Sequence, residues 1–481
     1  MSNSMNHAGH PEHAGQPELE PLGRVHFIGL GGAGMSAVAR VLLGRSVSVS
    51  GSDAADSRGL QALSSLGARV HVGHDAANLG DADTVVVSSA IRETNPELQE
   101  ARSRGLRILH RSEALAAAMS GREVIAVAGT HGKTTTTAMI TVMLQSAGAK
   151  PSFAIGGDVA ALGVNAEWAE GDVFVAEADE SDGSFLNYRP RIGVVTNVEA
   201  DHLDHYGSAE AVFQSFDSFA ALLPADDGVL VTCHDDAGAA ALAERTAATR
   251  RVRTYGYGDG ADIRISNTRA LGSTSNSLLS FTLDGLDSQQ ELQLGVPGRH
   301  NVLNAAAAFA VGLELGIDPA AAAAGLATFS GAARRFEAKG ESRGIRVFDD
   351  YAHHPTEVAA ALAAARTVAG EHRVHVLFQP HLFSRTMEFA EEFAAALSLA
   401  DSVHVLDIYA AREDPVEGVT SRLISDRLTV PGGHAPDAEE ALRSIAGTAE
   451  RGDIILTVGA GDVTRFGPLL VDLLAGDGDS R

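Results

Sequence analysis

Residues 124–137, VIAVAGTHGKTTTT, are the stretch that decides the fold. Val124–Ala128 is a short apolar run that predicts a buried strand, and a helical pattern begins at about Lys133. Gly129 and Gly132 lie between them and permit a tight turn whose N–H groups can face a polyphosphate. Lys133 supplies a positive charge and Thr134 a hydroxyl group for Mg2+. The stretch therefore predicts a strand, a phosphate-binding loop in the short form GTHGKT, and a helix.

Lysine usage supports a phosphate-binding role for this loop. Lys133, Lys150 and Lys339 are the only lysines, and arginine supplies the other long basic side chains. The chain thus keeps a compact ammonium group at the loop position where such a group suits a phosphate. The alternative is a turn rich in glycine and threonine that binds nothing, and it leaves this choice of residue unexplained.

Length, charge and cysteine content limit the class of protein. A chain of 481 residues has room for about three domains, each with its own core. The formal net charge of -25 argues against non-specific binding to nucleic acid or to an anionic membrane surface. The single cysteine, Cys233, excludes an internal disulfide and is typical of a reducing compartment. Because we find neither a transmembrane-length apolar run nor a signal peptide, we expect a cytoplasmic protein with no membrane partner.

The first 22 residues are rich in histidine, glycine, proline and glutamate and have no apolar period. We therefore expect them to be a disordered tail. His7, His10 and His13 are spaced like possible metal ligands, but an unstructured polar tail is the favoured interpretation.

Residues 23–121 are predicted to form a first α/β domain. A strand at Arg24–Ile28 is followed by the glycine turn GLGGAGMS, a helix to about Leu43, a strand at Val47–Ser50 and then Asp53. This order fits a Rossmann-like dinucleotide fingerprint, in which a pyrophosphate lies at the N-terminus of the helix. A purely structural glycine turn is the alternative.

Further strands complete this domain, at Ala68–Val72, Thr84–Ser89 and Arg107–Leu109. Ser88 and Ser89 stand at the end of a strand, which is where open α/β sheets bind ligands. Met119–Arg122 is the expected linker to the next domain.

Two strands of the next domain end in acidic residues. Asp172–Ala176 runs into EADESDGSF, and Ile192–Thr196 runs into NVEADHLDHY. So many carboxylates at one rim repel one another unless a cation is present. Oxygen ligands beside a phosphate loop suit Mg2+, which bridges phosphate oxygens. The alternative is a pair of solvated acidic turns.

The remainder of this domain combines alternating segments with an alanine-rich helix. Alternation predicts antiparallel strands at Val252–Gly258, Asp262–Ile265 and Leu278–Leu283. The segment VPGRHNVLNAAAAFAVGLELG then predicts a loop and a helix, with His300, Asn301 and Asn304 at the start of the helix. An amide there can pair with an adenine edge, but the spacing alone favours helix capping.

Strand and helix alternate after residue 332, so we expect a mostly parallel sheet. The predicted strands are Ile345–Asp349, Val374–Phe378, Val403–Ile408 and Ile454–Val458. The polar residues that follow them are Asp350, Tyr351, His353, His354, His381, Arg385, Glu413 and Asp462. Because parallel sheets bind ligands at this edge, the pattern predicts a second binding site, although any one of these histidines alone is more often structural.

Taken together, these segments resemble the Mur ligase family of peptidoglycan synthesis over essentially the whole chain after the tail. The motifs that carry the resemblance are GLGGAGMS, GSD, SSAI, AGTHGKTTT, EADESDGSF, TNVEADHLDHY, GRHNVLNA, RRFE, DDYAHHPTE, QPHLFSRT and GAGD. The resemblance implies an α/β fold of three domains. These are a Rossmann-like UDP-sugar domain at residues 23–121, a central P-loop ATPase domain with a mixed sheet at 122–331, and a Rossmann-like amino-acid domain at 332–481.

The implied reaction joins L-alanine to the lactyl carboxylate of UDP-N-acetylmuramate, with ATP becoming ADP and phosphate. A carboxylate is a poor electrophile, so we expect an acyl phosphate to form before the amine attacks. Phosphoryl transfer of this kind depends mainly on alignment and charge neutralisation by the protein and Mg2+.

The resemblance also implies roles for single residues. The ATP phosphates would be held by Ala128, Gly129, Thr130, His131, Gly132, Lys133 and Thr134. Mg2+ would be held by Thr134, Glu177 and His202. Asn304 would contact adenine, and Arg335 and Asp350 the phosphates and ribose. Tyr351, His353 and Arg385 would face L-alanine or its carboxylate. The UDP-sugar would be held by Gly31, Gly32 and Gly34, with Asp53, Ser88 and Ser89 in the same subsite. The expected catalytic residues are Lys133, His202, Arg335, His353 and Arg385, with His353 or His202 as the base for the amine.

The sequence departs from the family pattern in two places. Many relatives have arginine where Leu382 stands here, so recognition of the carboxylate depends more on Arg385. Some sister ligases carry a carbamylated lysine shortly after the metal-binding histidine. No lysine lies between Lys150 and Lys339, and Glu199 and Asp201 are the candidates to replace it.

Three alternative functions remain open at this stage. A nicotinamide oxidoreductase would account for GLGGAGMS, but not for the phosphate loop or the acidic rims. A P-loop ATPase without ligase activity would leave the C-terminal polar residues unexplained. A ligase of the same family that recycles a tripeptide onto the same sugar nucleotide is closer, although GLGGAGMS is more similar to the alanine-adding members.

Overall fold

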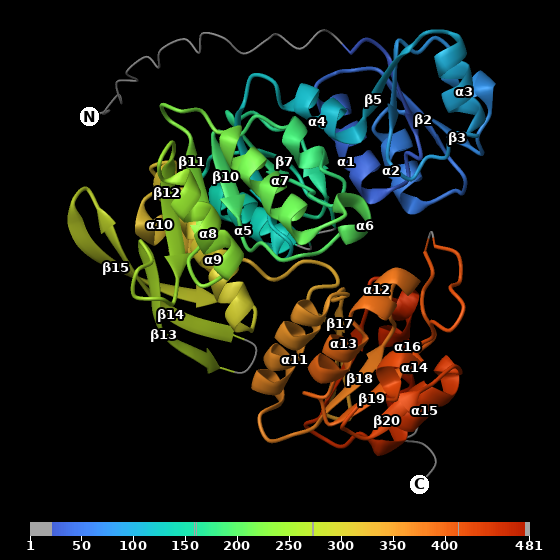
Figure 1. Cartoon of the computed structure of the whole chain (residues 1–481), viewed down its shortest axis with the longest axis vertical. Helices are drawn as coiled ribbons and strands as arrows, with labels where there is room; N and C mark the ends of the chain where they lie inside the picture. The colour runs from blue at the N-terminus through green and yellow to red at the C-terminus, as the bar shows by residue number, and fades with distance from the viewer. Residues whose placement is uncertain (1–21, 158, 160, 272–273, 412, 477–481) are drawn as a thin grey trace.

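The computed structural model describes residues 22–157, 159, 161–271, 274–411 and 413–476. The predicted tail with His7, His10 and His13 lies outside these residues. Three sheets organise the rest, and Figure 1 shows them as separate units along the blue-to-red course of the chain. We call these units the N-terminal, central and C-terminal domains. Within the described part of the chain, no helix combines the length and the apolar content that crossing a bilayer requires.

The N-terminal domain is a five-stranded sheet in the order β3-β2-β1-β4-β5, and every pair in it is parallel. Its strands are β1 Val25–Ile28, β2 Val49–Asp53, β3 Arg69–Val72, β4 Thr84–Val87 and β5 Arg107–His110. Its helices are α1 Ala33–Gly44, α2 Arg58–Ser65, α3 Pro96–Ser103 and α4 Arg111–Met119, with a 3-10 turn at Ala76–Leu79. The strand order reverses at β1 and β4. The glycine turn follows β1 and Ser88 follows β4, so both lie where such sheets open a ligand crevice.

The central domain is a ten-stranded mixed sheet in the order β15-β14-β13-β12-β11-β10-β6-β9-β7-β8. Its strands are β6 Glu123–Ala128, β7 Ser152–Ala154, β8 Ala166–Glu167, β9 Val173–Glu177, β10 Ile192–Val195, β11 Val229–Cys233, β12 Arg251–Gly256, β13 Ile263–Leu271, β14 Thr274–Leu283 and β15 Leu286–Leu294. Its helices are α5 Lys133–Ser146, α6 Leu203–Tyr206, α7 Ala209–Ala221, α8 Ala237–Thr246, α9 Arg299–Glu314 and α10 Pro319–Ala327, with a 3-10 turn at Ser184–Asn187. The predicted strand, loop and helix around residue 130 are confirmed as β6, the connecting turn and α5.

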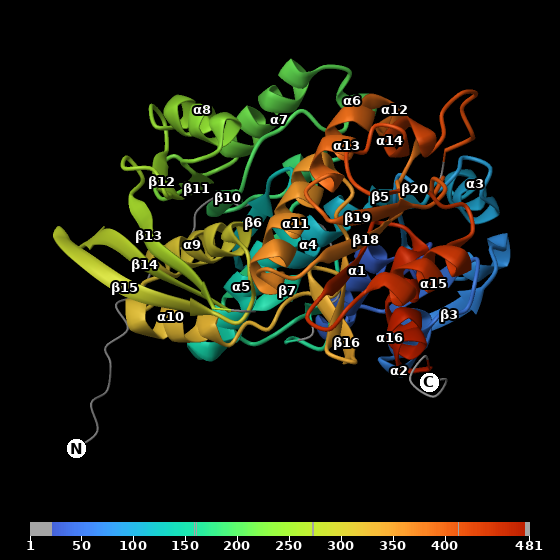
Figure 2. The same ribbon diagram turned by 90° about the horizontal axis from the view of Figure 1, so that it is seen from below.

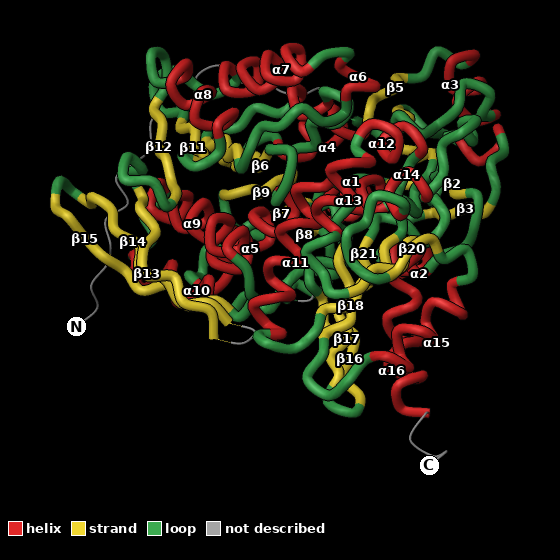
Figure 3. Tube along the Cα trace, turned by 60° about the horizontal axis from the view of Figure 1, so that its bottom comes forward, coloured by secondary structure: helices red, strands yellow, loops and turns green. Residues whose placement is uncertain are grey.

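One part of the strand prediction is wrong. The strand expected at 252–258 is β12, and it pairs in parallel with β11 and, over two residues, with β13. Only β13, β14 and β15 form the antiparallel ribbon. An alternating pattern reports that one face of a strand is exposed, and it does not report the direction of the neighbouring strand. Figures 2 and 3 show this ribbon beside α9 and α10, at the edge of the molecule away from α16.

The C-terminal domain is a six-stranded sheet in the order β16-β17-β21-β18-β19-β20. It is parallel as predicted, except that the edge strand β16 is antiparallel to β17. Its strands are β16 Glu337–Ser342, β17 Ile345–Asp350, β18 Val374–Phe378, β19 Ser402–Val405, β20 Gly432–His434 and β21 Ile454–Val458. Its helices are α11 Pro355–Ala369, α12 Phe383–Glu388, α13 Ala390–Leu397, α14 Arg422–Ser425, α15 Ala438–Thr448 and α16 Phe466–Gly476, with a 3-10 turn at Asp462–Arg465.

The N-terminal and central domains share one buried apolar cluster. At their contact the guanidinium groups of Arg45 and Arg122 lie 4.7 and 4.3 Å from the centre of the Trp168 ring. Asn165 adds a hydrogen bond of 3.0 Å from its side-chain amide to the carbonyl oxygen of Ala33. The C-terminal domain has two buried clusters of its own, one on each face of its sheet. The contacts described below between it and the central domain are polar.

Candidate active site

The phosphate loop owes its shape to two glycines. Gly129 has a φ of 131°, and a Cβ atom there would lie 2.1 Å from the hydroxyl oxygen of Thr196. Gly132 has a φ of 81° at the start of α5, and its Cβ would lie 2.7 Å from Oδ1 of Asn304. Only glycine fits both the backbone angle and these close approaches. The loop therefore lies tightly between the end of β10 and helix α9, with the N-terminus of α5 directed at the space where a phosphate would bind.

Lys133 lies in this loop and pairs with a buried carboxylate. Its Nζ donates hydrogen bonds to Oε1 of Glu180 and to the carbonyl oxygen of Gly129, both at 2.8 Å. Burial tends to lower the pKa of Lys133, but the charge of Glu180 outweighs it and raises that pKa above its ordinary value. The ammonium group is therefore charged and held inside the loop.

Glu180, the partner of Lys133, is itself almost fully buried. Burial raises the pKa of Glu180 to about 7, although the nearby charge of Lys133 opposes this. Its Oε2 is buried and has no hydrogen-bond partner among the described residues. An unpaired buried carboxylate oxygen is costly, and a cation or the hydrogen-bond donors of a ligand would relieve that cost.

The expected Mg2+ ligands Thr134, Glu177 and His202 lie together on this side of the loop. Oε1 of Glu177 accepts a hydrogen bond of 3.1 Å from the Thr134 hydroxyl. His202 follows β10, and its Nε2 lies 3.8 Å from Oε1 of Glu180. Two oxygen donors, an imidazole and the unpaired oxygen of Glu180 are a donor set that fits a divalent cation beside phosphate oxygens.

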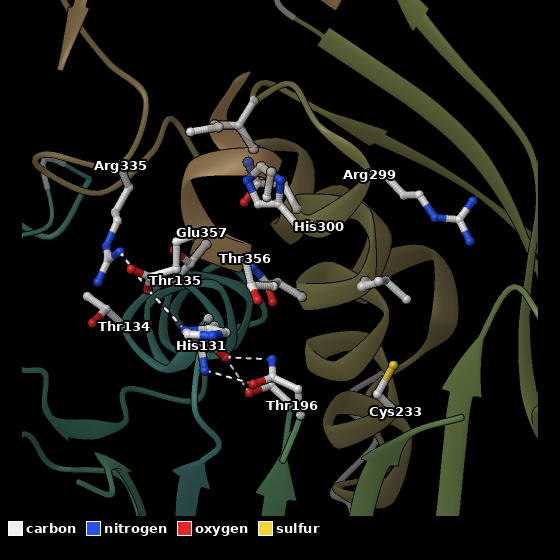
Figure 4. A pocket seen from close by; sticks show the side chains of 18 of the residues that line it. His131, Thr134, Thr135, Thr196, Cys233, Arg299, His300, Arg335, Thr356 and Glu357 are labelled. Carbon is white, nitrogen blue, oxygen red and sulfur yellow. Dashed lines mark hydrogen bonds and ion pairs between the residues drawn. The ribbon is translucent and has the colours of Figure 1, made fainter. Parts of the chain in front are cut away.

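A first cavity of about 420 Å3 opens beside the loop, and Figure 4 shows it from close by. One end is polar and contains His131, Thr134 and Arg335. The other end is formed by the central domain, where Cys233, Tyr255, Val296, Phe329 and Asn304 line the wall. A cavity with both apolar and polar side chains next to a phosphate loop suits a nucleoside.

The start of α9 differs from the favoured prediction. The helix begins after Gly298, and no side chain caps it. Asn301 donates instead to the carbonyl oxygen of Pro297 at 2.7 Å, while Asn304 lies beside the phosphate loop and lines the first cavity. The capping interpretation is therefore wrong, because Gly298 is the N-cap residue and both asparagines lie within the helix, where their side chains make other contacts.

A second cavity of about 580 Å3 lies on the other side of the loop. The N-terminal domain contributes Gly34 and Arg111 to this cavity. The central domain contributes the phosphate loop and the carboxylates of Glu177, Asp179 and Asp201, which we call the acidic rim. The C-terminal domain contributes Arg335, Tyr351 and His353. His131, Gly132, Thr134, Arg335 and Glu357 line both cavities, so the two meet at the phosphate loop.

The C-terminal side of the site is organised by Glu357, which the sequence analysis did not select. Its carboxylate accepts a hydrogen bond of 2.9 Å from the backbone N–H of His353 and lies 3.3 Å from Nδ1 of His131. Arg335 Nη1 is 3.6 Å away. Burial tends to raise the pKa of Glu357, but its basic neighbours hold that pKa well below its ordinary value. The signal in the sequence was its position four residues after His353 in the first turn of α11.

Three titratable groups here have shifted pKa values. Burial raises the pKa of Asp350 to about 6, although it accepts hydrogen bonds of 2.8 Å from the N–H groups of Phe336 and Ala352. Burial lowers the pKa of His353 to about 3, so this imidazole is neutral. Burial tends to lower the pKa of His131, but the carboxylates of Glu199 and Glu357 raise it to about 9.

Other expected site residues lie outside the two cavities. The N–H of Gly31 donates to Oδ2 of Asp53 at 2.8 Å, so that carboxylate closes on the glycine turn. Ser89 donates to Oδ2 of Asp182 at 3.3 Å, across to the central domain. Arg385 contacts Asp201, which does line the second cavity. The residues that do not line either cavity are Gly31, Gly32, Asp53, Ser88, Ser89, Ala128, Gly129 and Arg385.

Arg111 is a further residue that the sequence did not single out. It lines the second cavity, and its guanidinium donates to Oδ2 of Asp179 at 2.6 Å. A Cβ atom at Gly34 would lie 2.6 Å from Nη1 of Arg111, so the glycine turn leaves room for this arginine. The pair joins the N-terminal domain to the acidic rim of the central domain.

Comparison with known proteins assigns the three domains to one family. The Mur ligase family, catalytic domain, matches residues 24–123, the Mur ligase middle domain matches 127–312, and the Mur ligase, glutamate ligase domain matches 334–461.

Individual relatives match almost the whole chain. The UDP-N-acetylmuramate--L-alanine ligase of Paenarthrobacter aurescens is 64% identical over 460 residues, which are 95% of this chain and 98% of that protein. The ligase of the same name from Renibacterium salmoninarum is 62% identical, over 95% of this chain and 97% of that protein.

Two solved structures share the whole architecture. The crystal structure of the UDP-N-acetylmuramate-alanine ligase of Thermotoga maritima matches with a TM-score of 0.78 at 30% identity, over 94% of this chain and 99% of that chain. The murein peptide ligase of Psychrobacter arcticus matches with a TM-score of 0.68 at 26% identity, over 94% and 98%.

Proposed function

The chain belongs to the Mur ligase family, and we propose that it joins L-alanine to the lactyl carboxylate of UDP-N-acetylmuramate in the synthesis of peptidoglycan precursors, with ATP becoming ADP and phosphate. The observation that carries this proposal is the second cavity. There the phosphate loop, the acidic rim and polar residues of both outer domains face the same space. A ligase needs this arrangement because a nucleotide and two further substrates must meet at one point.

ATP binding follows from the two cavities that adjoin at the loop. We assign the nucleoside to the first cavity, beside Asn304 and Asp350, and the polyphosphate to the loop and Arg335. Lys133 then exchanges its contact with Glu180 for a phosphate oxygen.

We propose Mg2+ as the metal cofactor, held by Thr134, Glu177 and His202. When bound it neutralises phosphate charge and orients the polyphosphate oxygens. Of the two candidates to replace the carbamylated lysine of sister ligases, Asp201 lies closer to this group, with its Oδ2 3.7 Å from Nε2 of His202. Glu199 is directed instead at His131 and Thr356.

The reaction proceeds in two displacements. An oxygen of the lactyl carboxylate attacks the γ-phosphorus of ATP, the bond to ADP breaks, and an acyl phosphate forms. The amine of L-alanine then attacks the acyl carbon, phosphate leaves, and the amide forms. Lys133 and Arg335 stabilise the negative charge of the first step.

The amine must lose a proton before it attacks. Burial lowers the pKa of His353 to about 3, so this imidazole is neutral, and we assign the base to His353 because His202 is assigned to Mg2+. We assign recognition of the alanine carboxylate to Arg385 and Tyr351.

The UDP pyrophosphate is assigned to the N-terminus of α1, at Gly31, Gly32 and Gly34, with Asp53, Ser88 and Ser89 beside it. We also propose a cytoplasmic location, where ATP is regenerated.

The acceptor decides between this function and its nearest alternative. Purified protein is given MgCl2, ATP and UDP-N-acetylmuramate, and ADP release is followed after addition of L-alanine or of a cell-wall tripeptide. We expect ADP release and amide formation with L-alanine. Turnover with the tripeptide alone would assign the protein to the murein peptide ligases, and turnover with neither acceptor would overturn the proposal.

A further inference from the structure

A second group of possible metal ligands lies at the contact between the central and C-terminal domains. It consists of His131 in the phosphate loop, Glu199 after β10, and His354 at the start of α11. One ligand atom from each residue can be chosen so that all three lie within 4.8 Å of one another. Figure 4 shows His131 at this contact, next to Thr356 and Glu357 of the C-terminal domain. The group shares no residue with Thr134, Glu177 and His202.

One imidazole of this group, that of His354, has no hydrogen-bond partner in the described part of the protein. The His354 residue is 5% exposed, and neither of its ring nitrogens has a hydrogen-bond partner among the described residues. His131 differs, because its Nδ1 lies 3.3 Å from the carboxylate of Glu357 and its Nε2 lies 3.5 Å from that of Glu199. The two rings lie 4.8 Å apart, centre to centre, with a tilt of 33°. Two buried ring nitrogens without partners on one imidazole are unusual in a folded protein and call for a ligand.

The carboxylate of Glu199 is positioned between the two rings. Its Oε2 lies 3.5 Å from Nε2 of His131 and 3.9 Å from Nδ1 of His354. Ligands at about 2.0–2.1 Å from a tetrahedral Zn2+ ion lie roughly 3.4 Å from one another. The two distances from Glu199 therefore need to shorten by roughly 0.1 and 0.5 Å, and the widest of the three separations, which is at most 4.8 Å, by more. Thr356 fixes the orientation of Glu199 by a hydrogen bond of 2.9 Å to the same oxygen.

We propose that His131, Glu199 and His354 form a binding site for a transition-metal ion of the Zn2+ class, with water from the first cavity as the fourth ligand. Two imidazoles and a carboxylate with an open position are ligands that Zn2+ prefers, whereas Mg2+ prefers oxygen donors and water. The negative charges of Glu199 and Glu357 flank His131, at 3.5 and 3.3 Å, and favour a divalent cation there.

Such an ion would connect two domains. His131 and Glu199 belong to the central domain, and His354 precedes the first residue of α11 in the C-terminal domain. The ion would hold these domains together and occupy His131, which lines both cavities, so nucleotide would bind less readily. This inference does not depend on which substrate the protein uses.

Zinc binding is measured on the full-length, metal-free protein with a zinc-sensitive fluorescent chelator. Millimolar MgCl2 is present so that the site assigned to Mg2+, at Thr134, Glu177 and His202, is already occupied. We expect one Zn2+ ion bound per chain. His354→Ala and Glu199→Gln should each weaken binding at least about tenfold, because each removes one of three ligands. The matched control is His372→Ala, which removes an exposed histidine of the same domain and should change nothing.

The histidines of the first 22 residues need their own control, because they too can hold Zn2+. A variant with His7, His10 and His13 replaced by alanine should keep the bound ion. If this variant loses the ion while His354→Ala keeps it, the proposal is wrong.

Two further measurements guard against variants that fail to fold. Zn2+ should raise the thermal unfolding temperature of the wild type, and less so that of His354→Ala. Crystals soaked in Zn2+ should show an anomalous peak about 2.0–2.2 Å from ligand atoms of the three residues. Ordered crystals with no peak there would overturn the proposal.

Discussion

Arg385 donates from Nη2 to both carboxylate oxygens of Asp201, at 3.1 and 3.3 Å, although the two residues are 184 positions apart. Their side chains are only 9% and 8% exposed. The pair therefore connects the central and C-terminal domains, and it occupies the guanidinium group that we assign to the carboxylate of L-alanine. Binding of the amino acid then requires Arg385 to share or exchange its partner, and this links substrate binding to the contact between domains.

Arg385→Ala should raise the KM for L-alanine at least about tenfold and leave the KM for ATP nearly unchanged. It should also lower the free energy of unfolding by about 3 kcal/mol, because Asp201 stays buried without its counter-charge. Steady-state kinetics and urea unfolding measure the two effects. Arg366→Ala is the control, since its ion pair with Asp401 is about 40% exposed and its loss should cost less than about 1 kcal/mol. An unchanged KM for L-alanine would remove Arg385 from the amino-acid site.

Lys133→Ala should lower ATP turnover by about three orders of magnitude, because the loop loses the charge that stabilises the transferring phosphate. Binding of UDP-N-acetylmuramate, followed by calorimetry, should change little. The chain offers a matched control in Lys150→Ala, which removes an exposed lysine paired with Glu170. Full ligation by the Lys133 variant would contradict the assignment of the phosphate loop.

Glu177→Gln should raise the Mg2+ concentration needed for half-maximal activity at least about tenfold, because an amide is a weaker ligand for a hard cation than a carboxylate. Activity is measured as a function of MgCl2 at saturating ATP. Glu170→Gln, on the surface of the same domain, should leave the Mg2+ dependence unchanged. Equal Mg2+ dependence of both variants would argue against Glu177 as a ligand.

The elements that the sequence predicted well are those whose signal is local. The run Val124–Ala128, the two glycines and the following helix are decided by neighbouring residues, and they fold as β6, the loop and α5. The direction of β12 depends on which strand it meets, and the sequence analysis did not include β11 as its partner. The edge strand β16 has mostly polar, half-exposed residues, so no apolar pattern marks it.

The residues of the candidate site also fall into those that a local motif predicts and those that depend on contacts between domains. Motif residues such as Lys133, Thr134 and His353 come together as expected, because each follows a strand whose end is fixed by its sheet. The interactions that the sequence did not predict join different domains. Glu357 contacts His131, Arg111 contacts Asp179, and Arg385 contacts Asp201. Each depends on how two domains dock, which no local pattern reports.

His300 should make stability sensitive to acid. Burial, and then the positive charge of Arg335, lowers the pKa of His300 to about 4. A histidine whose pKa is lower in the folded state contributes stability that is present above pH 6.5 and is lost as pH falls toward 4, since only the unfolded chain then takes up the proton. The side chain is partly open to the first cavity, so we expect a loss on the order of 2 kcal/mol rather than the full value of the shift.

The test compares urea unfolding of the wild type and His300→Gln between pH 7.5 and 4, without nucleotide. Glutamine does not titrate in this range. As pH falls, the unfolding free energy of the wild type should therefore decrease by about 2 kcal/mol more than that of the variant. Other groups titrate equally in both proteins and cancel in this difference. His372→Gln, at an exposed position, should run parallel to the wild type at every pH. A His300 variant that also runs parallel would mean that this imidazole is as easily protonated in the folded protein as in the unfolded chain.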